Sequence, residues 1–214
     1  MEQRILLRDV CKTIRGKTIL DHINIELEAG KNYGICGRNG SGKTMLLRAI
    51  AGLIQVRGEI IVFGQNITAE HCFPDHMGLV IEKTELWSRL SAMENLRLLA
   101  AIRNVIGDAE MEQALVRVGL DPADRRPIRM YSMGMKQKLV LAQAIMEKPR
   151  LLLLDEPTNG LDDDTVRSFR RILREEQEKG CTSLIATHQR EDVSDLCDRI
   201  FRMEQGRCRE EGSL

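Results

Sequence analysis

The sequence predicts an α/β protein in which a mainly parallel sheet is covered by flanking helices. A glycine-rich stretch at 37–44 lies between a short apolar run, which indicates a buried strand, and a segment with helical character. Residues 151–154 are four consecutive leucines, a run too short for a helix and too apolar for an exposed strand. Strand-like and helix-like patterns alternate along much of the remaining chain. Together these three observations indicate the α/β class.

The first third of the chain predicts an antiparallel β subdomain beside this sheet. Apolar and polar residues alternate at 4–10 and 18–27, which predicts two half-exposed strands joined around Arg15 and Gly16. Further elements are expected at 33–36 (strand), 45–50 (helix), 59–63 (strand) and 77–81 (strand).

The segment from 87 to 149 changes to helical periodicity. Ser91 with Glu94 three residues later predicts a capped helix start. Three helices are indicated by three apolar stripes: Met93, Leu96, Leu99 and Ala100; Met111, Leu115 and Val118; Met135, Leu139, Ala142 and Ile145.

The sheet pattern resumes after this helical segment. The expected elements are a strand at 151–154, a helix from Asp163 to Gly180, a strand at 181–187, a short helix at 191–196 and a strand at 199–203. We therefore expect one domain over 1–214. Its core, with the β subdomain, comprises 1–83 and 150–214, and a helical insert occupies 84–149.

Composition narrows the possible functions. The 32 basic and 32 acidic side chains balance, so no overall field attracts nucleic acid, and no nucleic-acid partner is expected. No apolar run approaches the roughly 20 residues that cross a bilayer. The first residues lack the apolar core of a secretory signal. The six cysteines contain no C-x-x-C pair and are expected to be reduced thiols of a cytoplasmic protein.

The glycine-rich stretch matches the pattern G-x-x-x-x-G-K-T of a phosphate-binding loop, or P-loop, in the strand–loop–helix setting that the motif requires. Its backbone N–H groups and the following helix N-terminus would surround an anionic phosphate. Lys43 would reach the β- and γ-phosphates, and Thr44 would offer its hydroxyl to Mg²⁺. The chain is thus expected to bind a nucleoside triphosphate through Gly37, Arg38, Asn39, Gly40, Ser41, Gly42, Lys43 and Thr44.

Two adjacent carboxylates follow the leucine strand. In an open parallel sheet, ligands bind at the carboxyl ends of the strands. We therefore expect Asp155 to hold Mg²⁺ through water and Glu156 to polarise the water that attacks the γ-phosphate. His188 follows another strand, and its ring could donate a hydrogen bond to the γ-phosphate and orient that water. The alternatives are an acidic helix cap for the carboxylates and a surface position for the histidine.

The segment Tyr-Ser-Met-Gly-Met-Lys-Gln-Lys at 131–138 predicts a second anion site. Ser132 is a candidate helix cap, and Gly134 lets a ligand approach the first turn. Because one nucleotide needs a single phosphate loop, the simplest interpretation is that this helix end contacts the nucleotide of a partner subunit.

In order and spacing, these segments resemble the Walker A, signature, Walker B, D-loop (159–162) and H-loop elements of ATP-binding cassette (ABC) ATPases. The resemblance covers essentially the whole chain. It implies a P-loop NTPase core and a head-to-tail homodimer, or a pair with a related subunit, around two ATP molecules. It also implies a membrane permease contacted by the helical insert, which would place the chain on the cytoplasmic face of the membrane. The implied site residues are Lys43, Thr44, Asp155, Glu156 and His188 in cis and Ser132 and Gly134 in trans.

Three departures refine this resemblance. The signature reads Tyr-Ser-Met-Gly-Met, a form similar to exporter subfamilies. Ile14 stands where an aromatic residue commonly stacks on adenine. Glu82 replaces the Q-loop glutamine and would offer Mg²⁺ an anionic oxygen. Glutamate at this position resembles the bacterial subgroup that exports peptide antibiotics such as bacitracin and lantibiotics.

Two other interpretations remain open. A soluble ABC ATPase acting on a cytosolic assembly, such as an iron–sulfur scaffold, would share the same motifs. A small P-loop kinase would share only the phosphate loop and would give no role to residues 131–138.

Overall fold

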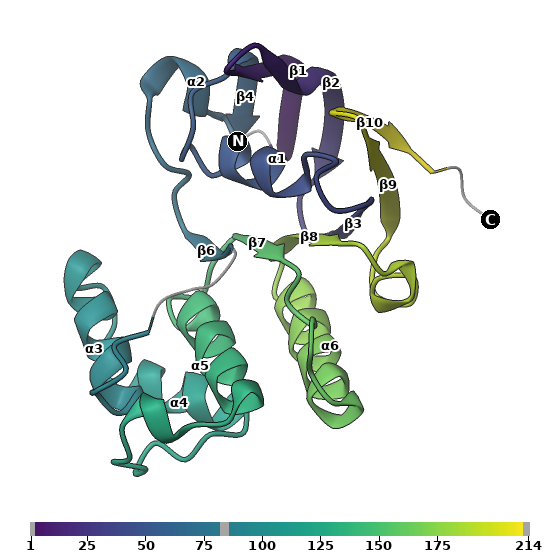
Figure 1. Cartoon of the computed structure of the whole chain (residues 1–214). Helices are drawn as coiled ribbons and strands as arrows, with labels where there is room; N and C mark the ends of the chain where they lie inside the picture. The colour runs from purple at the N-terminus through teal and green to yellow at the C-terminus, as the bar shows by residue number, and fades with distance from the viewer. Residues whose placement is uncertain (1–2, 82–85, 212–214) are drawn as a thin grey trace.

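The structure, a computed structural model, describes residues 3–81 and 86–211 and is arranged in layers (Figure 1). An antiparallel sheet forms one outer layer, a mainly parallel sheet forms the middle, and a group of helices covers the other side. Helix α1 lies between the two sheets. This is the predicted α/β architecture.

The strands are β1 (Arg4–Ile14), β2 (Lys17–Glu28), β3 (Asn32–Cys36), β4 (Arg57–Val62), β5 (Gln65–Asn66), β6 (Met77–Val80), β7 (Leu151–Asp155), β8 (Thr182–Thr187), β9 (Arg199–Glu204) and β10 (Arg207–Glu210). The helices are α1 (Lys43–Ile50), α2 (Ile67–Glu70), α3 (Ala92–Arg103), α4 (Asp108–Arg117), α5 (Met133–Ile145) and α6 (Asp163–Glu178), with short 3₁₀ turns at Ile128–Met130 and Arg190–Asp192.

The middle sheet has the order β10-β9-β3-β8-β7-β6, and all its pairs are parallel except β10 with β9. Strand β7 is buried on both faces. Leu151 and Leu153 face the core shared with α1 and the antiparallel sheet, whereas Leu152 and Leu154 face the core shared with the helices. This alternation follows from the two-residue period of a strand. An uninterrupted leucine run therefore packs side chains into two apolar cores, one on each face of the sheet.

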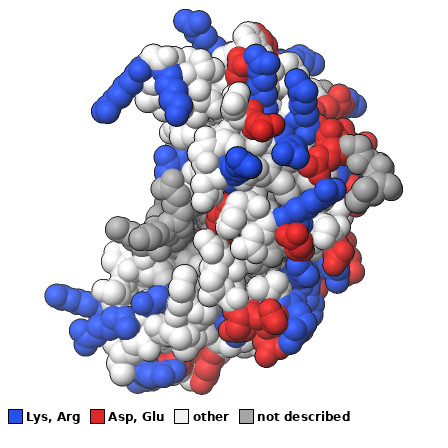
Figure 2. All heavy atoms as spheres, turned by 45° about the vertical axis from the view of Figure 1, so that its right-hand side comes forward, with Lys and Arg blue, Asp and Glu red and all other residues white. Residues whose placement is uncertain are grey.

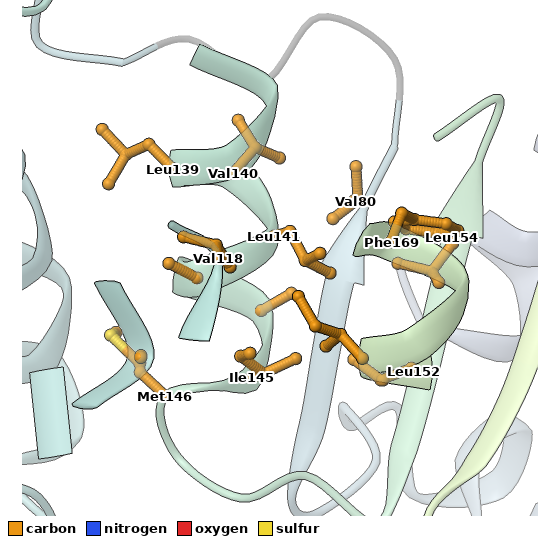
Figure 3. Packing of buried hydrophobic residues seen from close by; sticks show 14 of the residues in the cluster. Val80, Val118, Leu139, Val140, Leu141, Ile145, Met146, Leu152, Leu154 and Phe169 are labelled. Atoms are coloured by element: carbon orange, nitrogen blue, oxygen red, sulfur yellow. The ribbon is translucent and has the colours of Figure 1, made fainter. Parts of the chain in front are cut away.

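The second core lies between the sheet and helices α3–α6. In Figure 3, Leu141 of α5, Leu154 of β7 and Phe169 of α6 point toward one another. Arg117 of α4 extends this contact at the surface, because its guanidinium pairs with Glu175 at 2.9 Å and with the buried Glu176 at 2.7 Å. The helical insert is thus packed directly on the sheet and on α6.

The local signals for the helices are confirmed. The Ser91 side chain accepts a hydrogen bond from the N–H of Glu94, and the Glu94 carboxylate accepts one from the N–H of Ser91. The Arg15–Gly16 turn joins β1 to β2 as predicted, with both residues at positive φ. All six cysteines are free thiols, and burial raises the pKa of Cys181 to about 12.

The C-terminal prediction was wrong in two places. Residues 191–196 do not form a helix but continue the 3₁₀ turn at Arg190–Asp192, and the prediction omitted strand β10. The apolar spacing at Val193 and Leu196 reflects burial of two turn residues under the sheet rather than a helix face. Within residues 3–81 and 86–211, no helix has both the length and the apolar character needed to cross a membrane.

The two-sided burial of β7 generates a stability prediction. Leu153→Ala should lower the free energy of unfolding by about 2–5 kcal/mol, because Leu153 is 0% exposed and its removal leaves a cavity. Leu98→Ala, a matched truncation at a side chain that is 46% exposed, should cost less than about 1 kcal/mol. Urea denaturation followed by circular dichroism measures both. Equal losses in the two variants would contradict the proposed role of the strand.

Candidate functional site

The phosphate loop connects β3 to α1 at the carboxyl edge of the middle sheet. Gly42 has φ 110°, and a Cβ atom there would lie 2.9 Å from the Ile19 carbonyl oxygen. A Cβ on Gly37 would lie 2.3 Å from the Met203 carbonyl oxygen. Both positions therefore require glycine, one for its backbone conformation and both for close packing.

The turn between β9 and β10 is hydrogen-bonded to this loop. The N–H of Gly206, in the turn between β9 and β10, donates to the Ser41 carbonyl oxygen at 3.0 Å. The Gly206 carbonyl oxygen accepts from the N–H of Asp21 in β2 at 2.9 Å. The loop is thus joined through one glycine to the antiparallel sheet.

Lys43 lies at the centre of the loop and is only 5% exposed. Its ammonium donates to the carbonyl oxygens of Gly37 at 2.7 Å and Arg38 at 3.3 Å, and lies 3.5 Å from the Glu156 carboxylate. A buried ammonium requires such partners because desolvation penalises its charge. That Lys43 reaches the β- and γ-phosphates remains a prediction, and its ammonium lies at the loop that would hold them.

The hydroxyl of Thr44 donates to the Asp155 carboxylate at 2.6 Å, across a separation of more than a hundred residues in the chain. The structure therefore brings together two of the three side chains that the sequence assigned to one metal ion, the third being Glu82. A hydroxyl and a carboxylate are hard oxygen donors, the type that Mg²⁺ prefers. The donor set fits the predicted ion.

Glu156 follows β7 with φ 47°, a left-handed conformation that is uncommon for a residue other than glycine. Its N–H donates to the Ala186 carbonyl oxygen at 2.8 Å, which anchors the turn on β8. The carboxylate lies 2.8 Å from Nδ1 of His188. An ionised carboxylate can only accept a hydrogen bond, so Nδ1 of His188 carries the proton in this pair and donates a hydrogen bond to Glu156. This hydrogen bond fixes the orientation of both groups.

Ser41 provides an independent test of whether the loop fits a phosphate. Its hydroxyl is buried, and among the described residues it has no hydrogen-bond partner. Buried hydroxyls are normally paired, so this one has an unused donor directed into the glycine loop. An oxygen-rich anion would satisfy it.

The start of α5 lies apart from this loop. Ser132 accepts a hydrogen bond from the N–H of Met135 at 3.2 Å, which confirms it as the helix cap. Within the described part of the chain, no hydrogen bond joins residues 132–134 to the loop at 37–44. The flanking Met130 and Met133 are 61% and 66% exposed. The cap is thus presented at the surface between two exposed apolar side chains.

A groove lies between the carboxylates that follow β7 and the start of α5. Thr44, Asp155 and Glu156 line one side, and Met133 and Lys136 of α5 line the other. Figure 2 shows that the surface on the face drawn there carries both basic and acidic side chains. The groove itself mixes the two carboxylates with a lysine and apolar residues.

Residues 159–162 connect the carboxylates to α6. Asp162 caps α6 by accepting from the N–H of Thr165 at 2.8 Å, and this hydrogen bond lowers the pKa of the Asp162 carboxyl. Asp162 is thus the N-cap of α6, one residue before the helix start that the sequence predicts. A Cβ atom on Gly160 would lie 3.2 Å from Cε of Met133, so this turn adjoins the start of α5.

Sequence reasoning assigned no role to Gln137, one turn after the Ser132 cap. Its side-chain amide Nε2 donates to the Pro157 carbonyl oxygen at 3.0 Å and links α5 to the residue after Glu156. The sequence signal that could have identified it is a polar residue, Gln137, on the otherwise apolar side of α5. Ile14 ends β1 and is exposed, and the predicted metal ligand Glu82 lies outside the described residues.

Comparisons with known proteins identify the family of this chain. The profile of the ABC transporter family matches residues 20–159. An uncharacterised ABC transporter ATP-binding protein, YybJ of Bacillus subtilis, is 42% identical over 93% of this chain and 92% of its own length. The bacitracin transport ATP-binding protein BcrA of Enterococcus faecalis is 36% identical over 100% of this chain and 70% of its own length.

A solved structure has the same fold over nearly the whole chain. The dimeric structure of a bacterial ABC transporter cassette superposes with a TM-score of 0.85 at 25% identity, covering 97% of both chains. The chain therefore belongs to the ABC transporter ATP-binding family, whose activity is the hydrolysis of ATP.

Proposed function

We propose that this chain is the ATP-hydrolysing subunit of an ABC exporter, and that two copies close around two MgATP molecules to drive a membrane permease. The supporting observation is that the glycine loop and the exposed Ser132 cap of α5 are not joined by hydrogen bonds within the described residues, so each has groups left for a phosphate. The carboxylates after β7 and the start of α5 line one open groove between them. A head-to-tail pair of chains would bring complementary halves together.

In the proposed reaction, water attacks the γ-phosphorus of ATP and releases ADP and phosphate. Glu156 accepts the proton of that water, and the hydrogen bond from His188 holds the Glu156 carboxylate in position. Lys43 leaves its loop carbonyls for the β- and γ-phosphates and neutralises charge that develops in the transition state. In trans, Ser132 and the N–H of Gly134 contact the γ-phosphate of the partner's nucleotide.

Thr44 and Asp155 would hold the Mg²⁺ ion of MgATP, Asp155 through water. When bound, the ion neutralises phosphate charge and orients the nucleotide. The adjoining hydroxyl and carboxylate oxygens support this assignment.

The metal assignment can be tested with a fluorescent ATP analogue titrated with and without Mg²⁺. Without metal, Asp155→Asn should bind the analogue with a Kd within about twofold of the wild-type value. The factor by which Mg²⁺ lowers the Kd should be at least about tenfold smaller in the variant, because an amide carries no charge. Asp75→Asn, at an exposed aspartate remote from the loop, should behave as the wild type. A full Mg²⁺ effect in Asp155→Asn would rule this ligand out.

The composite site predicts that Glu156→Gln binds ATP without hydrolysing it and accumulates as a dimer. Size-exclusion chromatography with MgATP should then show the doubled mass. Adding Gly134→Asp should return the protein to a monomer, because the carboxylate would repel the partner's γ-phosphate.

The second substitution is suitable because a Cβ at Gly134 would make only an ordinary van der Waals contact, 3.9 Å from Oγ1 of Thr165, so we expect the variant to fold. A Glu156→Gln variant that stays monomeric with MgATP, or a double variant that still dimerises, would contradict the sandwich.

The helical insert offers a docking surface for the permease. A groove between α3, the end of α5 and β6 is lined by Leu79, Leu99, Ile102 and Met146. Ile102 is 77% exposed, an unusual solvent contact for an isoleucine on a helix. We propose that an amphipathic segment of the permease, at the cytoplasmic face of the membrane, occupies this groove.

The proposed cargo is a drug or antimicrobial peptide. The bacitracin transport relative and the signature form at 131–135 support this class. The second candidate, a soluble ABC ATPase bound to a cytosolic assembly, would use the same groove for a soluble partner.

Fractionation of the native host separates these candidates. Wild-type chain should sediment with membranes, and Ile102→Asp should lose most of that association because an aspartate opposes an apolar contact. Val116→Asp is the matched control, since Val116 is 62% exposed on α4 outside the groove. Wild-type chain that remains soluble with a stoichiometric soluble partner would favour the second candidate.

A further inference from the structure

Strands β1 and β2 carry two successive bulges of opposite sense. Between the pairs Leu7–Ile25 and Val10–Ile23, β1 contributes one extra residue. The extra residue in left-handed conformation is Asp9, with φ 51°. A two-against-one count of this kind defines a β-bulge, a device that redirects a side chain.

The next interval reverses the imbalance. Between the pairs Val10–Ile23 and Lys12–Leu20, the extra residue lies on β2, and His22 has φ 50°. Cys11 is opposite this second bulge. The second bulge therefore reverses the one-residue register shift of the first. The local effect of the two bulges is on the side chains of Asp9, Cys11 and His22.

These three side chains form a cluster of metal-ligand type. Asp9, Cys11 and His22 each offer one ligand atom, and these atoms all lie within 4.8 Å of one another. Nδ1 of His22 lies 2.5 Å from the Asp9 carboxylate, and the N–H of His22 donates to Sγ of Cys11 at 3.3 Å. Ligands about 2.0–2.3 Å from a tetrahedral Zn²⁺ lie roughly 3.5 Å apart, so small side-chain rotations suffice.

Neighbouring residues hold the bulged backbone in this form. Oδ1 of Asn24 accepts from the N–H of Asp9 at 2.9 Å, and Nδ2 of Asn24 donates to the His22 carbonyl oxygen at 3.0 Å. On β4, Gly58 leaves room for the first bulge, since a Cβ there would lie 2.3 Å from the Asp9 carbonyl oxygen. The backbone at the cluster is thus held by hydrogen bonds from Asn24 and by close packing against β4.

We propose that Asp9, Cys11 and His22 form a binding site for a single Zn²⁺ ion, with water completing the coordination. Thiolate, imidazole and carboxylate are the three side-chain ligand types that Zn²⁺ uses. Asp21, the nearest further carboxylate, lies 3.9 Å from Nε2 of His22 and is engaged by Arg207 at 2.6 Å. Binding releases the Cys11 thiol proton and any proton on His22 to solvent.

The test is titration of the nucleotide-free full chain with Co²⁺, a spectroscopic substitute for Zn²⁺, followed by Zn²⁺ displacement. The hydrogen bond with Asp9 raises the pKa of His22, so the titration is run at mildly alkaline pH, where the imidazole is neutral. Wild-type chain should bind one equivalent and show the near-ultraviolet absorption of a Co²⁺–thiolate bond. Zn²⁺ should abolish that absorption.

Variants locate the ion. Cys11→Ser should lose the thiolate absorption, and His22→Gln should weaken Zn²⁺ binding at least about tenfold, the effect that loss of even an outer-shell partner can have. Cys72→Ser is the matched control, because Cys72 also lies beside a histidine, His71, in the loop that precedes β6. Circular dichroism without metal checks that each variant folds. No thiolate absorption in the wild type, or its persistence in Cys11→Ser, would overturn the site.

Discussion

The burial of β7 on both faces is the constraint on which the rest of the molecule depends. Two cores meet at this strand, one shared with α1 and the antiparallel sheet and the other with the helical insert. Because neither core tolerates a polar side chain there, the first polar residues of the segment appear where the strand leaves the sheet. Asp155 and Glu156 are therefore held at the edge next to the phosphate loop, where Thr44 and Lys43 meet them. Packing of the leucines thus determines the position of the Asp155 and Glu156 carboxylates.

The sequence was informative wherever structure depends on local periodicity or on short motifs. The leucine strand, the Ser91 cap and the glycine loop were predictable because each is specified by a few adjacent residues. The pairing of Thr44 with Asp155 was predictable from the rule that loops gather at the carboxyl edge of a parallel sheet. The contact of Glu156 with His188 depends on the left-handed conformation of Glu156, and no local sequence pattern predicts that conformation.

Elements fixed by tertiary packing were harder to predict. Val193 and Leu196 have helical spacing, but they are buried under the sheet in a segment that is too short to form a helix. The antiparallel bulges at Asp9 and His22 interrupt an alternation that otherwise predicts two regular strands. Their register is set by Asn24 and Gly58, which act across strands. Single-strand patterns carry no information about such contacts.

The bridge from Gly206 to the phosphate loop has a consequence for biosynthesis. Gly206 bonds to Ser41 and to Asp21, so residues near the two ends of the chain meet beside the glycine loop. An N-terminal fragment emerging from the ribosome contains the whole glycine motif without this brace, because residue 206 is translated more than 160 positions after residue 41. The glycine loop acquires this brace only when the β9–β10 hairpin has been made. A truncated chain would carry the motif without the backbone bonds that hold it in place.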